Sequence, residues 1–487
     1  MNSEELPFAP RETSNSLQQQ LSSYHERQRN KQRRHHHSIL FGRIIVGFVA
    51  ASLLTLLLVA LWWPAPRNMR AIKVQTLLDI YEKERNFSGV VQLSYNGETK
   101  WQQAMGSANV PFQQPMKVQS VFPMGAHVQL LVAVAMYQLQ EKGVVQLSNP
   151  IDDYWTKKDW QAFGTNQTSW CPQVQKRTNH CERVTFQHLL YMGSGLESKH
   201  LDRMATLGRQ VGSFINTPLK FIPGTNYHDA KENYILLMYM IERLSELTFA
   251  HYVTLHIFQL LGLQSAGYDP FDGIVQVHTG LVDQYIQYYQ YENASISGNN
   301  TSVSPSKLIL EKHLHYVSTG SCALYQALEN PFDGFVSTST DMHFIYWDLF
   351  HAQGQYSKLL KPWSIADLLG IRNPAFRAFA QGVGVTFENE NEKAETTMNW
   401  PTRIAFCGTS GCATTCMAMQ MPSANISIVA SAFTNDMRLH FPSADALHAF
   451  TPRQLINKQN AMLREDLYEE NNGDVNTLAW KLLETFL

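Results

Sequence analysis

The segment 121-VFPMGAHVQLLVAVAMYQLQEKGVVQLSNPIDDYW-155 decides the predicted fold of this chain. Between residues 126 and 140 it is apolar on almost every side and carries no Lys, Arg, Asp or Glu. A helix that is apolar all round is typical of the interior of a domain. Gly143 follows the last apolar turn, at a position where glycine commonly ends a helix. The pattern therefore predicts a buried helix that ends at Gly143.

Strand patterns lie on both sides of this helix along the chain. Residues 88–110 alternate apolar and polar side chains around an Asn-Gly pair, which predicts a β-hairpin. Residues 417–435 predict two further strands around a turn. Helical spacing recurs between them, in the segments 185–195, 232–247, 249–263 and 339–354. Strands at both ends with helices between them predict one α+β unit, whose sheet is closed by its C-terminal strands.

Two other regions complete this outline. Residues 74–87 have apolar side chains at helical spacing and predict a helix before the hairpin. Residues 270–330 are polar, and the stretch 295–306 is rich in Ser, Asn and Gly, which predicts a surface excursion. We see no internal repeat.

The composition excludes several classes of protein. The 487 residues are 16% charged and 11% aromatic, which argues against a disordered chain. Lys and Arg number 39 against 41 Asp and Glu, a formal net charge of -2. A nearly neutral balance gives no electrostatic reason to expect nucleic acid as a partner.

A run of twenty uncharged residues, Ile44 to Trp63, precedes the helix and strand patterns. This length suits a helix that crosses a bilayer, and Pro64 and Pro66 end it. A cleaved signal peptide is the alternative, but the run is too long, starts too late and is followed by no small-x-small cleavage site. We therefore predict a membrane-spanning helix over residues 39–63.

The charges on either side of this run predict its orientation. Six Lys or Arg residues closely precede it and three follow it, so the N-terminus is expected in the cytoplasm and residues 64–487 on the other side. The exported part is then periplasmic in a bacterium, or extracellular or luminal in a eukaryote. The predicted segments are a basic and polar tail 1–38, the membrane helix 39–63, a linker 64–73, the main domain 74–455 and a helical tail 456–487.

All six cysteines follow the predicted anchor, in a compartment where disulfides form. Cys171 and Cys181 enclose a short polar segment and are predicted to form a disulfide. The spacing of Cys407, Cys412 and Cys416 would allow a metal site, but no His, Asp or Glu lies close by in the sequence. Disulfides or buried thiols are the preferred interpretation there, and we predict no metal. The pairing of the remaining cysteines, Cys322 included, stays open.

The order of these elements and several local strings resemble the serine β-lactamase and penicillin-binding-protein superfamily. The similarity is greatest to its branch of class C β-lactamases, D-alanyl-D-alanine carboxypeptidases and LACTB-like proteins. The strings that carry it are the segment 121–155 already quoted, VTFQHLLYMGSGLES, FIPGTNYHDAKENYILLMYMIERLSEL and ENPFDGFVSTSTDMHFIYWDLF. The resemblance implies a β-lactamase/transpeptidase-like fold, an antiparallel sheet with a helical subdomain. It also implies a serine hydrolase site that needs no cofactor.

The residues at the family's catalytic positions are altered. The family has Gly-Ser-x-x-Lys at the start of the buried helix, a spacing that puts nucleophile and base on one face. This chain reads Gly125-Ala126-His127-Val128-Gln129, so Ala126 replaces the nucleophile and Gln129 the base. The family's Tyr-x-Asn element falls on Asp229-Ala230-Lys231, and its Lys/His-x-Gly strand falls on Thr409-Ser410-Gly411. Only the final glycine fits.

These losses together predict a pseudoenzyme that acts by binding a peptide, a peptidoglycan fragment or a protein partner. The alternative is a divergent hydrolase that uses relocated residues. Ser304 and Lys307 form a literal Ser-x-x-Lys, but they lie in the polar excursion. His127 and His228 flank two altered elements and are candidates to line the pocket, as is Ser410.

Overall fold

The computed structural model divides the chain into two compact units, Met1–Ile72 and Lys73–Leu487. Parts of each unit are described. The described residues are 22–23, 26–27, 29, 45–54, 69–175, 180–197, 206–268, 280–293, 310–318, 334–370, 384–386, 400–410, 413–439 and 478–485.

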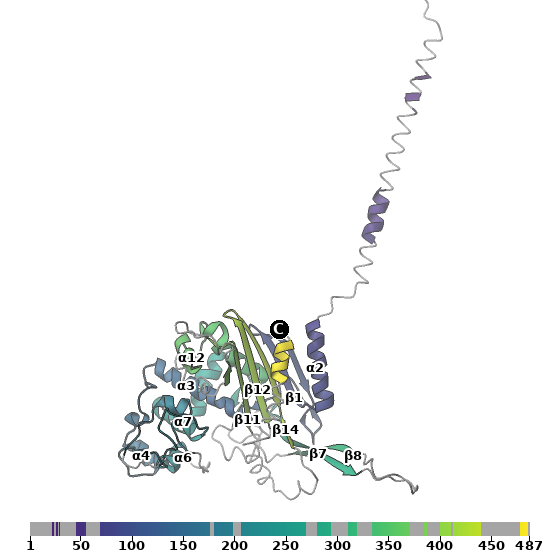
Figure 1. The fold of residues 1–487 in the computed structure, drawn as a ribbon. Helices are drawn as coiled ribbons and strands as arrows, with labels where there is room; N and C mark the ends of the chain where they lie inside the picture. The colour runs from purple at the N-terminus through teal and green to yellow at the C-terminus, as the bar shows by residue number, and fades with distance from the viewer. Residues whose placement is uncertain are drawn as a thin grey trace, which may run out of the picture. The chain divides into compact units, whose positions relative to one another are not determined.

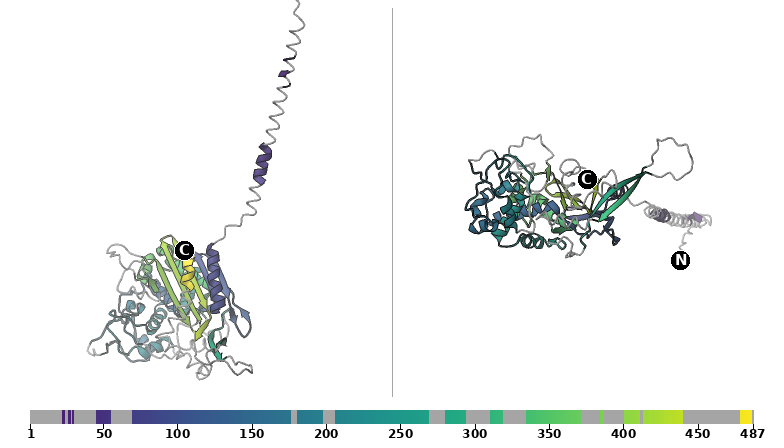
Figure 2. Two further views of the ribbon diagram at one scale, coloured as in Figure 1. Left: turned by 45° about the vertical axis from the view of Figure 1, so that its right-hand side comes forward. Right: turned by 90° about the horizontal axis from the view of Figure 1, so that it is seen from below.

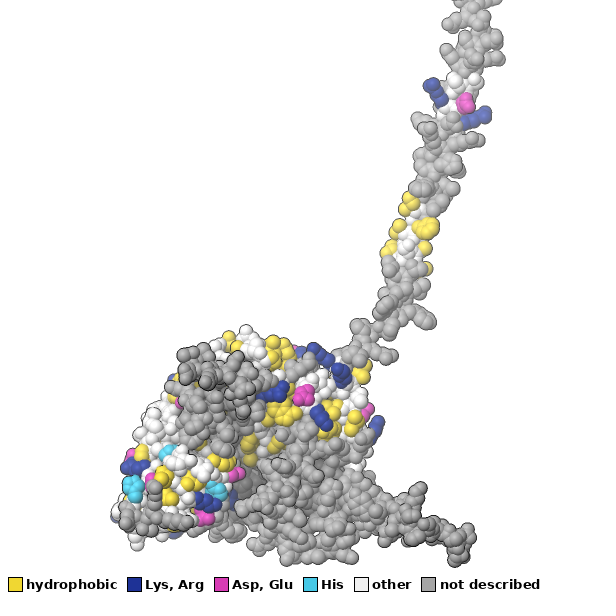
Figure 3. Space-filling view, in the orientation of Figure 1, with side chains coloured by type: hydrophobic (Ala, Val, Ile, Leu, Met, Phe, Trp, Pro, Cys, Tyr) yellow, Lys and Arg dark blue, Asp and Glu magenta, His cyan; other side chains and the backbone are white. Residues whose placement is uncertain are grey.

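In the first unit, residues 45–54 are helical and their apolar side chains are exposed, as the yellow band in Figure 3 shows. They belong to the predicted membrane helix 39–63, whose other residues lie outside the described ones. Most of the predicted tail 1–38 also lies outside them. Among the described residues of the whole chain, no helix is both long and apolar enough to cross a membrane.

A six-stranded antiparallel sheet is central to the second unit (Figure 1), with the strand order β10-β11-β12-β13-β1-β2. Its strands are β1 (Gly89–Tyr95), β2 (Glu98–Met105), β10 (Gly384–Thr386), β11 (Arg403–Ser410), β12 (Ala413–Ser423) and β13 (Ile426–Thr434). The predicted hairpin is β1 and β2, and both turn residues, Asn96 and Gly97, have the positive φ of a tight hairpin turn. Because β13 pairs with β1, the C-terminal strands close the sheet as predicted.

One face of the sheet is covered by the helical region. Its central helix is α3 (Val128–Glu141), which is buried along most of its length and ends two residues before Gly143, as predicted. Helices α7 (Glu232–Ser245) and α11 (Ser339–Phe350) pack in the same hydrophobic core. Further helices among the described residues are α4 (Lys157–Phe163), α5 (Phe186–Leu190), α6 (Leu207–Phe214), α8 (Phe249–Val253), a π-helix (Thr254–Phe258), α9 (Gln259–Leu261), α12 (Pro362–Leu368) and the 3-10 helices η2 (Ile151–Tyr154) and η4 (His351–Gly354).

The opposite face of the sheet is covered by α2 (Met69–Arg85) and by the helical residues 478–485. Figures 1 and 2 show these two helices side by side along the strands, the first in purple and the second in yellow. Leu78 on α2 and Leu483 on the C-terminal helix are fully buried in this second core. Residues from the two ends of the second unit therefore share this second core.

One helix and one small sheet differ from the sequence predictions. Helix α2 begins at Met69, inside the segment expected as a linker, because no proline or glycine follows Pro66 to prevent it. Strands β7 (Tyr285–Asn293) and β8 (Leu310–Ser318) pair on either side of the stretch 295–306, where no strand was predicted, and β14 (Asp436–Leu439) pairs with β7 in parallel. The tyrosine-rich sequence of β7 favours a strand despite its polarity. Residues 456–477 of the predicted helical tail and the stretch 295–306 lie outside the described residues.

Candidate functional site

The altered Ser-x-x-Lys positions lie where the buried helix begins. A 3-10 turn, η1 (Gly125–His127), leads directly into α3. Ala126 and Gln129 are partly exposed, whereas His127 and Val128 between them are buried. The spacing of three therefore places both positions on one accessible side, as the sequence predicts. Alanine offers no nucleophile and glutamine no useful base, so this side provides neither group for acyl transfer.

Strand β11 passes close to this turn at Gly408. A Cβ atom built on Gly408 would lie 2.7 Å from the Met124 carbonyl oxygen and 3.0 Å from the Ala126 nitrogen. These separations are too short for any side chain, so only glycine allows the strand to approach the start of α3. Gly408 was not among the predicted site residues. Thr409 and Ser410 follow it on the strand, and Gly411 lies outside the described residues.

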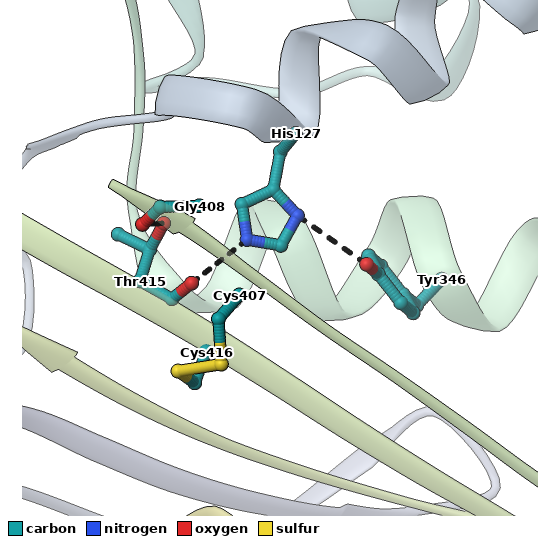
Figure 4. Close-up of a disulfide and its surroundings, with 6 residues drawn as sticks. All are labelled: His127, Tyr346, Cys407, Gly408, Thr415 and Cys416. Atoms are coloured by element: carbon teal, nitrogen blue, oxygen red, sulfur yellow. Dashed lines mark hydrogen bonds between the residues drawn. A yellow bond between two sulfur atoms is a disulfide. The ribbon is translucent and has the colours of Figure 1, made fainter. Parts of the chain in front are cut away.

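His127 is buried beneath the accessible side rather than exposed on it. Figure 4 shows its two hydrogen-bond partners. Its Nε2–H donates to the carbonyl oxygen of Thr415 at 3.0 Å, which leaves Nδ1 to accept from the Tyr346 hydroxyl at 3.3 Å. Burial lowers the pKa of His127 to about 4, opposed only in part by the bond to Thr415. The histidine is therefore neutral near pH 7 with both ring nitrogens engaged, which differs from a pocket-lining role.

A disulfide lies beside this histidine. Cys407 on β11 and Cys416 on β12 are directly opposite each other and are joined by a disulfide bond (Figure 4). The thiols are therefore not available to a metal ion, and the preferred interpretation of this pair is confirmed. The predicted bond between Cys171 and Cys181 is also present. Cys322 and Cys412 lie outside the described residues.

The second altered element precedes α7. Asp229 is exposed, Ala230 is buried, and Lys231 is the N-cap residue directly before α7. His228 accepts a hydrogen bond at its Nε2 from the Lys220 ammonium, 2.7 Å away. His228 is therefore hydrogen-bonded to Lys220, whereas His127 is hydrogen-bonded to Thr415 and Tyr346.

A third histidine, which the sequence did not indicate, lies in a buried polar network between the sheet and α11. The ring of His343 bonds to the hydroxyls of Ser94 and Ser431, each at 2.8 Å. Burial lowers the pKa of His343 to about 3. All three residues are at most 4% exposed, so no substrate in solution reaches these serines. The serine–histidine pairs therefore link the sheet to the helix.

Comparison with known proteins agrees with this architecture. Residues 74–446 match the Beta-lactamase family. PbpX of Bacillus subtilis is 27% identical over 191 residues, 39% of this chain, and the chain spans about two fifths (43%) of the length of that relative. A penicillin-binding protein from Bacillus halodurans has a similar structure, with a TM-score of 0.52 and 19% identity over 77% of this chain and 97% of that one.

FmtA from Staphylococcus aureus is similar in the same way, with a TM-score of 0.51 and 16% identity over 81% of this chain and 90% of that one. At these identities the structural likeness concerns the fold alone. The family match covers most of the second unit and more than half of the chain. We conclude that this protein belongs to the β-lactamase family.

Proposed function

We propose that this protein is a membrane-anchored member of the β-lactamase family that no longer catalyses acyl transfer and acts by binding. The ligand would be a peptide, a peptidoglycan fragment or a protein partner. The observation that carries this proposal is Ala126. It occupies the accessible start of α3, where the resemblance places a nucleophilic serine, and Gln129 occupies the place of the base.

The replacement of both the nucleophile and the base supports this proposal. Removing a nucleophile in a serine hydrolase leaves only the residual rate due to substrate binding and oxyanion stabilisation. Here the expected base is replaced as well. At the second element, Asp229 and Lys231 replace the Tyr and Asn that the resemblance implies.

The alternative is a hydrolase that uses relocated residues. Within the described residues, the serines bound to His343 are buried, which gives this alternative no support. Ser304 and Lys307 lie outside the described residues. The binding function is therefore the one that the described site favours.

Anchoring is proposed on the uncharged run Ile44–Trp63 and on the charges that flank it. The N-terminus would be cytoplasmic, the protein single-pass, and the β-lactamase-related domain periplasmic or extracellular. The two disulfides of the described residues fit an oxidising compartment. Protease protection of the full chain in sealed membrane vesicles, with cleavage sites on either side of the run, tests this topology. Complete extraction of the chain by alkaline carbonate would contradict it.

Covalent labelling tests the loss of catalysis. The full-length chain is incubated with a fluorescent penicillin, with a fluorophosphonate and with a neutral fluorogenic ester. We expect no labelling and no turnover of the wild type. The Ala126→Ser, Gln129→Lys double variant is the positive counterpart, and gained labelling at residue 126 would place the site correctly. Labelling of the wild type that persists after surface serines are replaced would exclude the pseudoenzyme.

A further inference from the structure

Phe406 lies on β11, two residues before the close approach at Gly408, and is partly exposed. We propose that Phe406 makes the position beside Ala126 selective for an uncharged, apolar group, so that a ligand there is not held through a free carboxylate. This inference rests on the proposed function, because it assumes that the altered site still binds a ligand. It concerns the chemistry of that ligand.

The first step is the register of β11 against α3. The resemblance implies a strand with a Lys or His two residues before a glycine, and the sequence alignment placed that glycine at Gly411. Among the described glycines, Gly408 lies against Ala126, since a Cβ there would meet the Ala126 nitrogen at 3.0 Å, whereas Gly411 lies outside the described residues. A Lys/His-x-Gly element that ends at this contact reads Phe406-Cys407-Gly408.

The second step is the direction of the Phe406 side chain. Residues two apart on a strand share a face, so Phe406 is on the face of Gly408. Its ring lies 5.1 Å from the His127 ring, centroid to centroid, in an edge-to-face arrangement. The alternate residues face the other way, because Cys407 packs against the second core and Arg403 lies over the Trp480 ring. Phe406 therefore occupies the position of the Lys or His in a Lys/His-x-Gly element that ends at Gly408.

The third step is the charge of the surrounding segments. The described parts of η1, α3 and this face of β11 contain no Lys or Arg side chain, since Arg403 is on the opposite face. His127 is neutral near pH 7 because burial lowers its pKa. A carboxylate brought to this position would lose part of its hydration and would gain no charged partner from these three segments. An amide or an apolar group carries no such cost, and the Phe406 ring offers it apolar contact.

The test compares an acid with its amide. The full-length chain in detergent is titrated with N-acetyl-D-alanyl-D-alanine and with the C-terminal amide of the same dipeptide, and both Kd values are measured by calorimetry. We expect the wild type to bind the acid more weakly than the amide. Phe406→Lys is expected to lower the ratio of the acid Kd to the amide Kd by roughly fivefold, the size of a partly exposed ion pair.

Two matched variants make the result specific. Phe406→Leu should retain the wild-type ratio, and so should Thr409→Lys, which puts the same cation at the position given by the sequence alignment. If Phe406→Lys fails to fold, Phe406→His at pH 6 keeps a ring at this position and adds a charge. The assignment would be overturned if Thr409→Lys, and not Phe406→Lys, lowered the ratio of the acid Kd to the amide Kd. It would also be overturned if the wild type and all variants had the same ratio, or if neither dipeptide bound detectably. Labelling of the wild type by the fluorescent penicillin or the fluorophosphonate would contradict the proposed function. That measurement is independent of the two Kd values.

Discussion

The Nε2 atom of His127 lies 3.0 Å from the carbonyl oxygen of Thr415 and donates a hydrogen bond to it. This bond joins η1, the turn that leads into the central helix α3, to strand β12 of the sheet, across 288 residues of sequence. The Thr415 hydroxyl in turn donates to the Gly408 carbonyl oxygen at 3.2 Å, so the helix, β11 and β12 are connected at one point. The altered site is therefore held in a fixed geometry although its nucleophile and base are replaced.

Acid should destabilise this protein through its two buried histidines. The folded-state pKa values of His127 and His343 are about 4 and about 3, below the ordinary value of 6.5. Below pH 6.5 the unfolded chain binds protons that the folded chain does not, so the stabilising contribution is complete above pH 6.5 and is lost as pH falls towards 4. Each histidine then lowers the free energy of unfolding by about 1.4 kcal/mol per pH unit.

Urea unfolding of the wild type and of His127→Gln at several pH values between 7 and 4.5 measures this effect. As the pH falls, the free energy of unfolding of the variant should decrease less steeply than that of the wild type. The two slopes should differ by about 1.4 kcal/mol per pH unit. His251→Gln, at an exposed position of α8, makes the same substitution outside these buried networks and is the matched control. Parallel slopes for the wild type and His127→Gln would show that folding does not lower the pKa of His127.

Gly408→Ala should destabilise the protein by about 1–3 kcal/mol, because the new methyl group is forced against the Met124 carbonyl oxygen and the Ala126 nitrogen. Gly143→Ala is a useful contrast, since a Cβ there meets nothing within 4 Å and its cost arises only from a φ of +72°. Thermal unfolding followed by circular dichroism compares the two. A Gly408→Ala variant as stable as the wild type would mean that β11 does not lie against α3 in this register.

Much of this architecture was predictable because its signals are local. The apolar run of α3 and the Asn96-Gly97 turn each specify their own element. The accessible Ala126 and Gln129 follow from helical spacing alone. The contact of Gly408 was not predictable in the same way, because it depends on how a distant strand is placed against α3. His127 was predicted to line a pocket because it lies beside an altered element. Its direction in the structure is set by Thr415 and Tyr346, which no local pattern reveals.

Removal of the Cys407–Cys416 bond should lower stability without abolishing the fold. The bond closes a loop of nine residue steps, for which the chain-entropy relation gives about 2–3 kcal/mol. The strands are already paired on both sides of it, so the hairpin itself should remain. Unfolding of the Cys407→Ala, Cys416→Ala variant measures the loss, and a Cys171→Ala, Cys181→Ala variant provides a loop of similar length away from the site. An increase in labelling at β11 by hydrogen exchange is expected only for the first variant.

The C-terminal helix should be required for the stability of the whole domain. Leu482 and Leu483 are buried against the sheet together with Leu78 of α2, so their loss opens the second core. Leu483→Ala is expected to cost about 2–5 kcal/mol, as for other buried leucines. Glu484→Ala, on the exposed side of the same helix, should be within about 0.5 kcal/mol of the wild type. Equal midpoints for both variants in urea would show that residues 478–485 are not packed on the sheet, and that α2 covers this face without them.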